Sequence, residues 1–436
     1  MAKMAINFEK TVGKIKRVNG VGQPPTVGAA YDPLYHYLTE ANIPYARLHD
    51  VGDTFGGGRF VDIPNLFPNF DADENDPANY FFPYTDWLLE ALDKAGVEPY
   101  FRLGVSIENI VDRYASPRLF PPKDYEKWAR ICEHVIRHYT EGWANGYHLK
   151  IEYWEIWNEP DNCQDLKWNA MWQGNNIDYY RLYEVTARHL KACFPHLKIG
   201  GYANSGFYAI TEGDGDPRKK YFVDFFIGFL DWITSEEHKA PIDFFSWHSY
   251  DTIENTMIQA DYCRKTLDRY GFKDLEIHLN EWNPSPRVLG LMRHAAYVGG
   301  MLLAYQNAPV DVACFYDARI GISEYGSLFN PITRQPFADY DAFVMFGRLL
   351  KLGTQAKLSC DQPGVYAVAA TNGAQKGVMI VNTLPDPCTV DLTAAGADLN
   401  SAVCEETSRY KHMEKSDLIH DGHLFLNGES LIYITL

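Results

Sequence analysis

The segment YWEIWNEPD, residues 153–161, places several groups that could do chemistry in a stretch that otherwise has the composition of a buried strand. An ionised carboxylate that leaves water costs several kcal/mol unless it is paired or protonated. Glu155 and Glu159 are four positions apart, so a regular strand would point both to the same side. One interpretation is an ion-paired core strand. The other is a catalytic acid whose pKa is raised by apolar surroundings, next to Asn158, whose amide could hold a substrate hydroxyl.

A second carboxylate has a similar setting, because Glu281 in NEWN, like Glu159 in WNEP, stands beside Asn and Trp. Two carboxylates that face each other across a pocket are the minimal set for glycoside hydrolysis. At about 5 to 5.5 Å one acts as nucleophile and the other as acid and then base, whereas a wider gap lets water attack directly. Apolar walls and a neighbouring negative charge would raise the pKa of the acid, while hydrogen bonds and cations keep the nucleophile ionised. The structural alternative is a pair of core salt bridges.

The elements that must position these residues are short strands that alternate with longer amphipathic segments up to about residue 350. The predicted strands are 15–21, 45–50, 98–104, 153–159, 198–204, 243–250, 276–282 and 312–318. Segments such as PPKDYEKWARICEHVIRHY lie between them and repeat apolar residues at three- and four-residue steps, as helices do. Eight successive strand–helix units predict a (β/α)₈ TIM barrel more than an open sheet. No glycine fingerprint for a dinucleotide follows the first strand.

In a barrel of this kind, chemistry belongs at the carboxyl ends of the strands, where the loops converge. The polar and aromatic side chains predicted there are Arg47, His49, Asn158, Glu159, His248, Tyr250, Glu281, Tyr316, Asp317 and Arg319. The glycine run FGGGRF, which follows the second strand, lacks the lysine of a phosphate cradle. We expect it to form a loop at the mouth of the barrel.

The pattern changes after about residue 353, where short alternating strands are separated by Gly, Asn and Pro turns. This pattern predicts a smaller C-terminal antiparallel β-sandwich domain. We therefore expect a catalytic barrel over 14–352 and an accessory domain over 353–436, to which 1–13 could add an edge strand.

Composition narrows the class of partner. The net charge of −17 argues against nucleic acid or an anionic membrane and favours a neutral or cationic ligand such as an oligosaccharide. No apolar segment is long enough for a signal sequence or membrane anchor, and the eight cysteines form no C-x-x-C pair, so we expect a cytoplasmic protein with reduced thiols. We expect no cofactor and no metal, since no H-x-H or comparable cluster supports a zinc site built from His49, His248 and Glu281. A homo-oligomer is compatible with the sequence, which does not fix the oligomeric state.

The motifs EIWNEP, PPKDYEKW, LYEVTAR, SWHSY, IHLNEWN and YARLHD together resemble glycoside hydrolase family 39, the family of β-xylosidases and α-L-iduronidases within a clan of retaining (β/α)₈ glycosidases. The resemblance implies that Glu159 is the acid/base and Glu281 the nucleophile. It also implies a role for each of the following: Asn158 as donor to the sugar 2-hydroxyl, Tyr250 as hydrogen-bond partner of the nucleophile, Arg47 as the cation that keeps it anionic, and His49 and His248 as ligands of sugar hydroxyls.

The chain departs from the xylosidases of that family on the eighth strand, where FYDARIG places Tyr316 at the position of a tryptophan floor, with Asp317 and Arg319 beyond it. On the third strand, Arg102 stands where an acid is expected and is predicted to pair with Glu155. These departures do not affect the predicted reaction, but they leave the identity of the terminal sugar open.

Strand parity is used for two of the remaining residues, Trp157 and His278. Trp157 and Trp282 are expected in inner packing, with Trp157 inward like Glu159, whereas Tyr316 and Trp247 are candidates for a stacking platform. His278 has the opposite parity to Glu281 and is expected to face the helices.

The leading functional hypothesis is a retaining exo-glycosidase that removes a terminal sugar, most simply β-D-xylose, from short oligosaccharides by double displacement. The same chemistry on α-L-arabinose, β-glucose, β-galactose or a uronate is the first alternative. A non-catalytic carbohydrate-binding barrel is the alternative of another class, although such a protein would be expected to have lost one of the two carboxylates.

Overall fold

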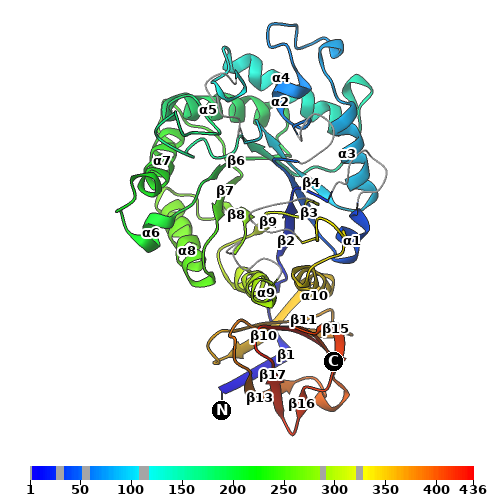
Figure 1. Ribbon diagram of the computed structural model, residues 1–436. Coiled ribbons are helices and arrows are strands. Elements are labelled where there is room, and N and C mark those ends of the chain that lie inside the picture. Colours follow the sequence, from blue (N-terminus) through cyan, green and yellow to red (C-terminus); the bar gives the residue numbers. More distant parts are fainter. Residues whose placement is uncertain (1, 26–33, 52–58, 108–116, 285–290, 321–327) are drawn as a thin grey trace.

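The computed structural model describes residues 2–25, 34–51, 59–107, 117–284, 291–320 and 328–436. The first four residues of the predicted FGGGRF loop, 55–58, lie outside these ranges. Eight strands form a closed barrel in which every neighbouring pair is parallel (Figure 1). They are β2 (Arg17–Gly22), β3 (Tyr45–Leu48), β4 (Glu98–Leu103), β5 (Tyr153–Ile156), β6 (Lys198–Asn204), β7 (Phe244–Ser249), β8 (Glu276–Trp282) and β9 (Val312–Phe315). The predicted TIM barrel is confirmed, with each strand inside or within one residue of its predicted segment.

Helices surround the barrel, as the three- and four-residue apolar steps predict. They are α1 (Tyr35–Glu40), α2 (Ile63–Leu66), α3 (Pro83–Lys94), α4 (Tyr125–Thr140), α5 (Asn176–Cys193), α6 (Tyr208–Glu212), α7 (Pro217–Thr234), α8 (Ile253–Arg269), α9 (Met292–Asn307) and α10 (Ala338–Leu352). Local sequence fixes several starts: the Asp124 side chain accepts from the backbone N–H of Lys127 at α4, and Asn175 and Asp178 form a reciprocal capping box at α5. None of the described helices is long and apolar enough to cross a membrane.

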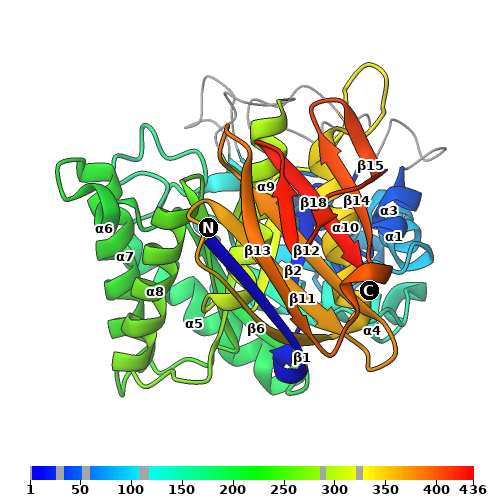
Figure 2. The same cartoon turned by 90° about the horizontal axis from the view of Figure 1, so that it is seen from below.

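A second sheet of ten strands contains both ends of the described chain (Figure 2). Its order is β15-β14-β18-β12-β11-β10-β1-β13-β17-β16. The bounds are β1 (Ala2–Lys14), β10 (Thr354–Cys360), β11 (Val365–Thr371), β12 (Lys376–Asn382), β13 (Cys388–Ala395), β14 (Val403–Ser408), β15 (Lys411–Ser416), β16 (Ile419–His420), β17 (His423–Leu426) and β18 (Ser430–Thr435). The sheet curls around its own apolar core, as a β-sandwich does, while its other face packs on α9 and α10.

The expectation that the N-terminal segment adds an edge strand is wrong. β1 lies inside the sheet, antiparallel to β10 and parallel to β13, and Met4 and Ile6 on it are buried. The edges are β15 and β16. Sequence alone could not place β1, because both partners come from residues at least 340 positions further along the chain. The predicted limits at 14–352 and 353–436 stay a prediction.

The inside of the barrel is layered. Its lowest layer is a separate apolar cluster, made of Tyr45, Tyr100, Tyr153, Phe244, Val312 and Cys314. His278 belongs with this layer, since its ring stacks on Phe244 at 4.5 Å between centroids and its Nδ1 lies 3.1 Å from the Tyr100 hydroxyl. The expectation that His278 faces the helices is therefore wrong. The strand register shifts on both sides of the end of β8, so residues before and after the shift do not alternate as one regular strand.

Candidate active site

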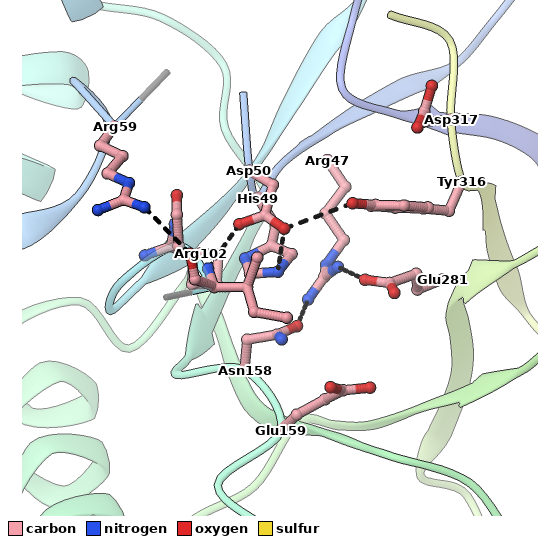
Figure 3. Close-up of polar contacts among 12 residues, drawn as sticks. Arg47, His49, Asp50, Arg59, Arg102, Asn158, Glu159, Glu281, Tyr316 and Asp317 are labelled. Carbon is pink, nitrogen blue, oxygen red and sulfur yellow. Dashed lines mark hydrogen bonds and ion pairs between the residues drawn. The ribbon is translucent and has the colours of Figure 1, made fainter. Parts of the chain in front are cut away.

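Two glutamates meet at the carboxyl ends of the barrel strands. Glu159 follows β5, Glu281 lies on β8, and His248 on β7 stands between them. The His248 Nδ1 atom is 2.7 Å from Glu159 Oε1 and 3.7 Å from Glu281 Oε1. One oxygen of each carboxylate and this nitrogen all lie within 4.8 Å of one another. The barrel therefore brings the two predicted carboxylates to one place, where both point toward a shared space (Figure 3).

Glu281 receives two strong donors. The Arg47 Nη1 atom donates to Glu281 Oε2 at 3.0 Å, and the Tyr250 hydroxyl donates to Oε1 at 2.6 Å. Burial, and then the charge of Glu281, raise the pKa of Tyr250 well above its ordinary value, so this hydroxyl keeps its proton and donates. Both donors bind a carboxylate more strongly than a carboxylic acid. The arrangement suits a nucleophile that must be anionic before it attacks.

Glu159 has a different environment. Its Oε1 lies 2.7 Å from His248 Nδ1, and its Oε2 accepts from Asn162 Nδ2 at 2.9 Å. Burial, the largest influence, raises the pKa of Glu159, but the hydrogen bond and charge of His248, with Asn162 and Arg218, together hold the pKa below its ordinary value. The prediction that apolar walls and a neighbouring negative charge raise the pKa of Glu159 is therefore wrong, and the imidazole of His248 is the main reason for the difference.

The loop that carries Glu159 is shaped by two residues in the left-handed region, Trp157 at φ 74° and Glu159 at φ 43°. The backbone N–H of Glu159 donates to Ala203 O, which ties this loop to the end of β6. Asp161 adds a second tie, since its carboxylate accepts from the Asn204 amide at 2.6 Å and from the Ser205 hydroxyl at 2.9 Å. Glu159 therefore owes its direction to this turn and not to strand alternation.

Arg47 connects the two layers of the site. Its Nε and Nη2 atoms donate to Glu155 Oε2 at 2.9 and 2.7 Å, and its Nη2 also donates to Asn158 Oδ1 at 2.5 Å. A guanidinium can only donate, so it fixes the amide oxygen of Asn158 toward itself and leaves the NH₂ group to face elsewhere. Asn158 thus presents a donor, as its predicted contact with a sugar hydroxyl requires.

The predicted pair between Arg102 and Glu155 is wrong. The two residues are register partners on β4 and β5, yet Arg102 Nη2 donates to Asp62 Oδ1 at 2.6 Å. Glu155 is instead bound by Arg47, by the Ser246 hydroxyl at 2.6 Å and by the Asn280 amide. Its role is structural, as expected, but with other partners.

His49 lies at the end of β3, beneath the same opening. Burial, and then the charges of Arg47 and Arg102, hold the pKa of His49 well below its ordinary value, so the ring is neutral. Its Nε2 is 3.4 Å from Asp50 Oδ2, and its buried Nδ1 has no hydrogen-bond partner among the described residues. A neutral imidazole with a vacant nitrogen is suited to a sugar hydroxyl.

The end of β9 brings Tyr316 to the site and holds Arg319 beside an acid. The Tyr316 ring lies edge-on to Tyr250 at 6.4 Å between centroids, and its hydroxyl is 3.4 Å from Asp50 Oδ2. Arg319 Nε is 3.3 Å from Asp317 Oδ2, so its charge is shared with a fully buried carboxylate. The role of Tyr316 as a stacking platform stays a prediction.

Three tryptophans are buried packing residues. Trp282 packs on Tyr305 and Phe315 as expected. Trp157 is also packing, but it points outward, since it contacts Trp128 of α4 and its Nε1 donates to Met171 O at 2.9 Å. Trp247 is fully buried against Phe207, so the prediction that it forms a stacking platform is wrong.

Asp50, which stands at the mouth between His49 and Tyr316, was not among the predicted site residues. Burial, the main cause, and the negative charge of Glu281 raise the pKa of Asp50 to about 6, against the hydrogen bond from the Ile107 N–H at 2.7 Å. The signal was present, because Asp50 directly follows His49 at the end of the second predicted strand.

Within the described residues, the active-site group that could hold a metal ion is Glu159, His248 and Glu281. His49, which belongs to the zinc set considered from the sequence, is not part of this group. His248 Nδ1 contacts Glu159, and Glu281 accepts from Arg47 and Tyr250, whereas the buried Nε2 of His248 has no hydrogen-bond partner among the described residues.

Residues 63–317, more than half of the chain, match the sequence model described as Glycosyl hydrolases family 39. A β-xylosidase of Geobacillus stearothermophilus is 24% identical over 280 residues, which cover 57% of this chain and 50% of that protein. One from Caldicellulosiruptor saccharolyticus is 26% identical over 314 residues, or 65% of this chain and 57% of the relative. The chain thus spans about half the length of these curated relatives.

Two solved structures share the fold over nearly their whole length. A glucosidase from Croceicoccus marinus superposes with a TM-score of 0.78 at 21% identity, covering 100% of this chain and 98% of the other. A GH39 β-xylosidase from Caulobacter crescentus gives a TM-score of 0.70 at 17% identity, with 99% of both chains covered. At this identity the likeness establishes the architecture.

Proposed function

This chain belongs to glycoside hydrolase family 39, and we propose on that premise that it is a retaining exo-glycosidase that removes a terminal sugar from short oligosaccharides. Glu281 is the nucleophile and Glu159 the acid/base in this proposal. The observation that carries it is the short distance between the two carboxylates, which have oxygens within 4.8 Å of each other. Retaining enzymes separate their carboxyl groups by about 5 to 5.5 Å, whereas inverting enzymes need roughly 6.5 to 9.5 Å to admit a water.

The first step forms a covalent intermediate. An oxygen of Glu281 attacks the anomeric carbon while the bond from that carbon to the leaving oxygen breaks, and the leaving oxygen takes a proton from Glu159. The proton is available on the pair formed by Glu159 Oε1 and His248 Nδ1, 2.7 Å apart. As the ester forms, Glu281 loses its charge and its hydrogen bonds from Arg47 and Tyr250 weaken.

The second step returns the enzyme to its starting state. Glu159, now deprotonated, takes a proton from a water that attacks the anomeric carbon, and Glu281 leaves as a carboxylate. Arg47 and Tyr250 regain their full hydrogen bonds as this charge reappears, so they stabilise the second transition state more than the ester. Substitution at the anomeric carbon occurs twice, and the configuration is retained.

For the substrate, we propose β-D-xylose as the terminal sugar, supported by the names of the two curated relatives. β-Glucose is the main alternative, since the Croceicoccus marinus structure is described as a glucosidase; α-L-arabinose and β-galactose need the same machinery. A uronate is disfavoured because the Arg319 guanidinium is already paired with Asp317.

The test is labelling with an activated 2-deoxy-2-fluoroxyloside, which slows the second step so that the glycosyl-enzyme accumulates. We expect mass spectrometry to find the sugar on Glu281, and Glu281→Gln to lose turnover while it still binds xylose. A panel of nitrophenyl glycosides then ranks the sugars. Labelling of another acid, or inversion of configuration in the product, would contradict the proposal.

A further inference from the structure

A second group of ligand-type side chains lies on the outer helix ring, away from the barrel mouth. His189 and Cys193 are four residues apart on α5, so they share one face of that helix, and Glu133 faces them from α4, which packs beside it (Figure 1). Glu133 Oε2 is 2.6 Å from His189 Nε2, and Cys193 Sγ is 3.8 Å from the same nitrogen. All three donor atoms lie within 4.8 Å of one another.

This arrangement is not that of a Cys–His–acid relay. In a relay the nucleophile and the acid bind different nitrogens of the imidazole, so that the ring can pass a proton between them. Here the carboxylate and the sulfur both face Nε2. Three donor atoms that converge in this way are placed as ligands around a common point.

The distances suit a zinc ion. Zinc binds Cys sulfur at about 2.3 Å and His nitrogen or carboxylate oxygen at about 2.0 to 2.2 Å in tetrahedral geometry, which separates ligand atoms by roughly 3.4 to 3.6 Å. The sulfur and the nitrogen, 3.8 Å apart, are already close to this spacing. The oxygen and the nitrogen must separate by less than about 1 Å, which a glutamate side chain on a helix surface can accommodate.

A neighbouring residue orients the carboxylate. Arg137 Nε donates to Glu133 Oε1 at 2.8 Å, so the other oxygen, Oε2, is the one left to face His189. Metal-binding carboxylates and imidazoles are held by second partners of this kind.

We propose that Glu133, His189 and Cys193 form a zinc site that joins α4 to α5. One nitrogen, one sulfur and one oxygen donor favour zinc or a similar transition metal over magnesium or calcium, which prefer oxygen ligands alone. The side chains of His189 and Glu133 are 31% and 15% exposed, so water can take the fourth position. The site lies at the end of α5, close to where β6 begins, which is the end of the barrel opposite its mouth. Its effect is therefore on stability and not on catalysis.

Cobalt provides the test, because a thiolate bound to Co²⁺ gives a charge-transfer band in the near ultraviolet that oxygen and nitrogen ligands do not. We expect the full chain to bind one Co²⁺ with this band, and Zn²⁺ to abolish the band and raise the unfolding midpoint. Cys193→Ser and His189→Ala should remove both effects, whereas glycosidase activity stays unchanged in Cys193→Ser. Arg137→Gln should weaken zinc binding roughly 10- to 100-fold.

Two controls separate this site from others. Cys360→Ser alters a cysteine in the second sheet and should keep the band, while Glu281→Gln removes a member of the active-site group and should keep both the band and the thermal shift. Absence of a charge-transfer band in the unaltered protein, or its persistence in Cys193→Ser, would overturn the proposal. Neither result depends on which sugar the enzyme cleaves.

Discussion

The hydrogen bond from Tyr250 to the proposed nucleophile predicts a specific kinetic change in Tyr250→Phe. The bond is 2.6 Å long, within the range of charge-assisted O–H···O⁻ bonds. A hydrogen bond to a charged group contributes about 1.5 to 3 kcal/mol, and about 1.4 kcal/mol corresponds to a factor of ten in rate. Since Glu281 regains its charge only in the second step, we expect the loss of the hydroxyl to slow that step roughly 10- to 150-fold.

The first step should respond differently. There Glu281 starts as an anion and loses its charge, so removal of the hydroxyl takes stabilisation from the starting state as well as from the transition state. With a substrate that has a good leaving group, kcat should fall by the predicted factor and KM should fall with it, leaving kcat/KM nearly unchanged. A burst of released aglycone should appear in stopped-flow measurements, because the ester accumulates.

Tyr179→Phe is the matched control. It also removes a buried tyrosine hydroxyl, one that donates to Ile156 O at 2.8 Å without touching either carboxylate. This variant should lose some stability and show neither the drop in KM nor the burst. If Tyr250→Phe lowers kcat and kcat/KM equally and shows no burst, the assignment of the hydroxyl to the second step is wrong.

The two remaining predictions concern the acids on either side of the nucleophile. Glu159→Ala should lower kcat/KM about 10²- to 10⁴-fold for alkyl or sugar leaving groups and far less for dinitrophenyl glycosides, because only the former need a proton; a uniform loss across leaving groups would contradict the acid role. Asp50→Asn should stabilise the fold at about pH 8, since the pKa of Asp50 rises from 3.8 to about 6 on folding and ionisation above that pH opposes the folded state. The rise of about two units sets an upper limit of about 3 kcal/mol, and the gain should shrink between about pH 6 and pH 4, where the folded wild type takes up its proton. Urea unfolding of wild type and variant at about pH 8 and about pH 4 measures this difference, and an equal gain in the free energy of unfolding at each pH would rule out titration of Asp50 as the cause.

The barrel strands could be predicted because each is a short buried run bounded by turn residues, a signal that is local in sequence. Their ends were less certain. The fourth predicted strand ran to residue 159, whereas β5 ends at Ile156, since Trp157 takes a left-handed conformation at φ 74°. That conformation turns the chain into the loop that carries Glu159, and the residue types at 157–159 do not predict this turn.

Contacts between distant segments were the harder part. Arg102 and Glu155 are adjacent in the barrel, as predicted, but Asp62, the residue directly before α2, binds Arg102 in place of Glu155. His278 was misplaced for a related reason, because strand parity predicts the side of a residue only where the strand is regular. The prediction of the catalytic pair did not depend on these assignments, since any parallel barrel gathers the carboxyl ends of its strands at one mouth.

Glu155 and the proposed nucleophile, Glu281, share one cation but have separate tasks. Glu155 is fully buried and accepts hydrogen bonds from two nitrogens of Arg47, from Ser246 and from Asn280. Its hydrogen-bonding capacity is therefore met without a contact to either catalytic carboxylate. From Arg47, Glu281 accepts a hydrogen bond only from the remaining nitrogen, Nη1. Arg47 therefore pairs with two carboxylates unequally: Glu155 holds it in place through two of its nitrogens, and it only partly neutralises the charge of Glu281. A carboxylate that were paired as completely as Glu155 would be a poor nucleophile, because attack would cost it the whole ion pair.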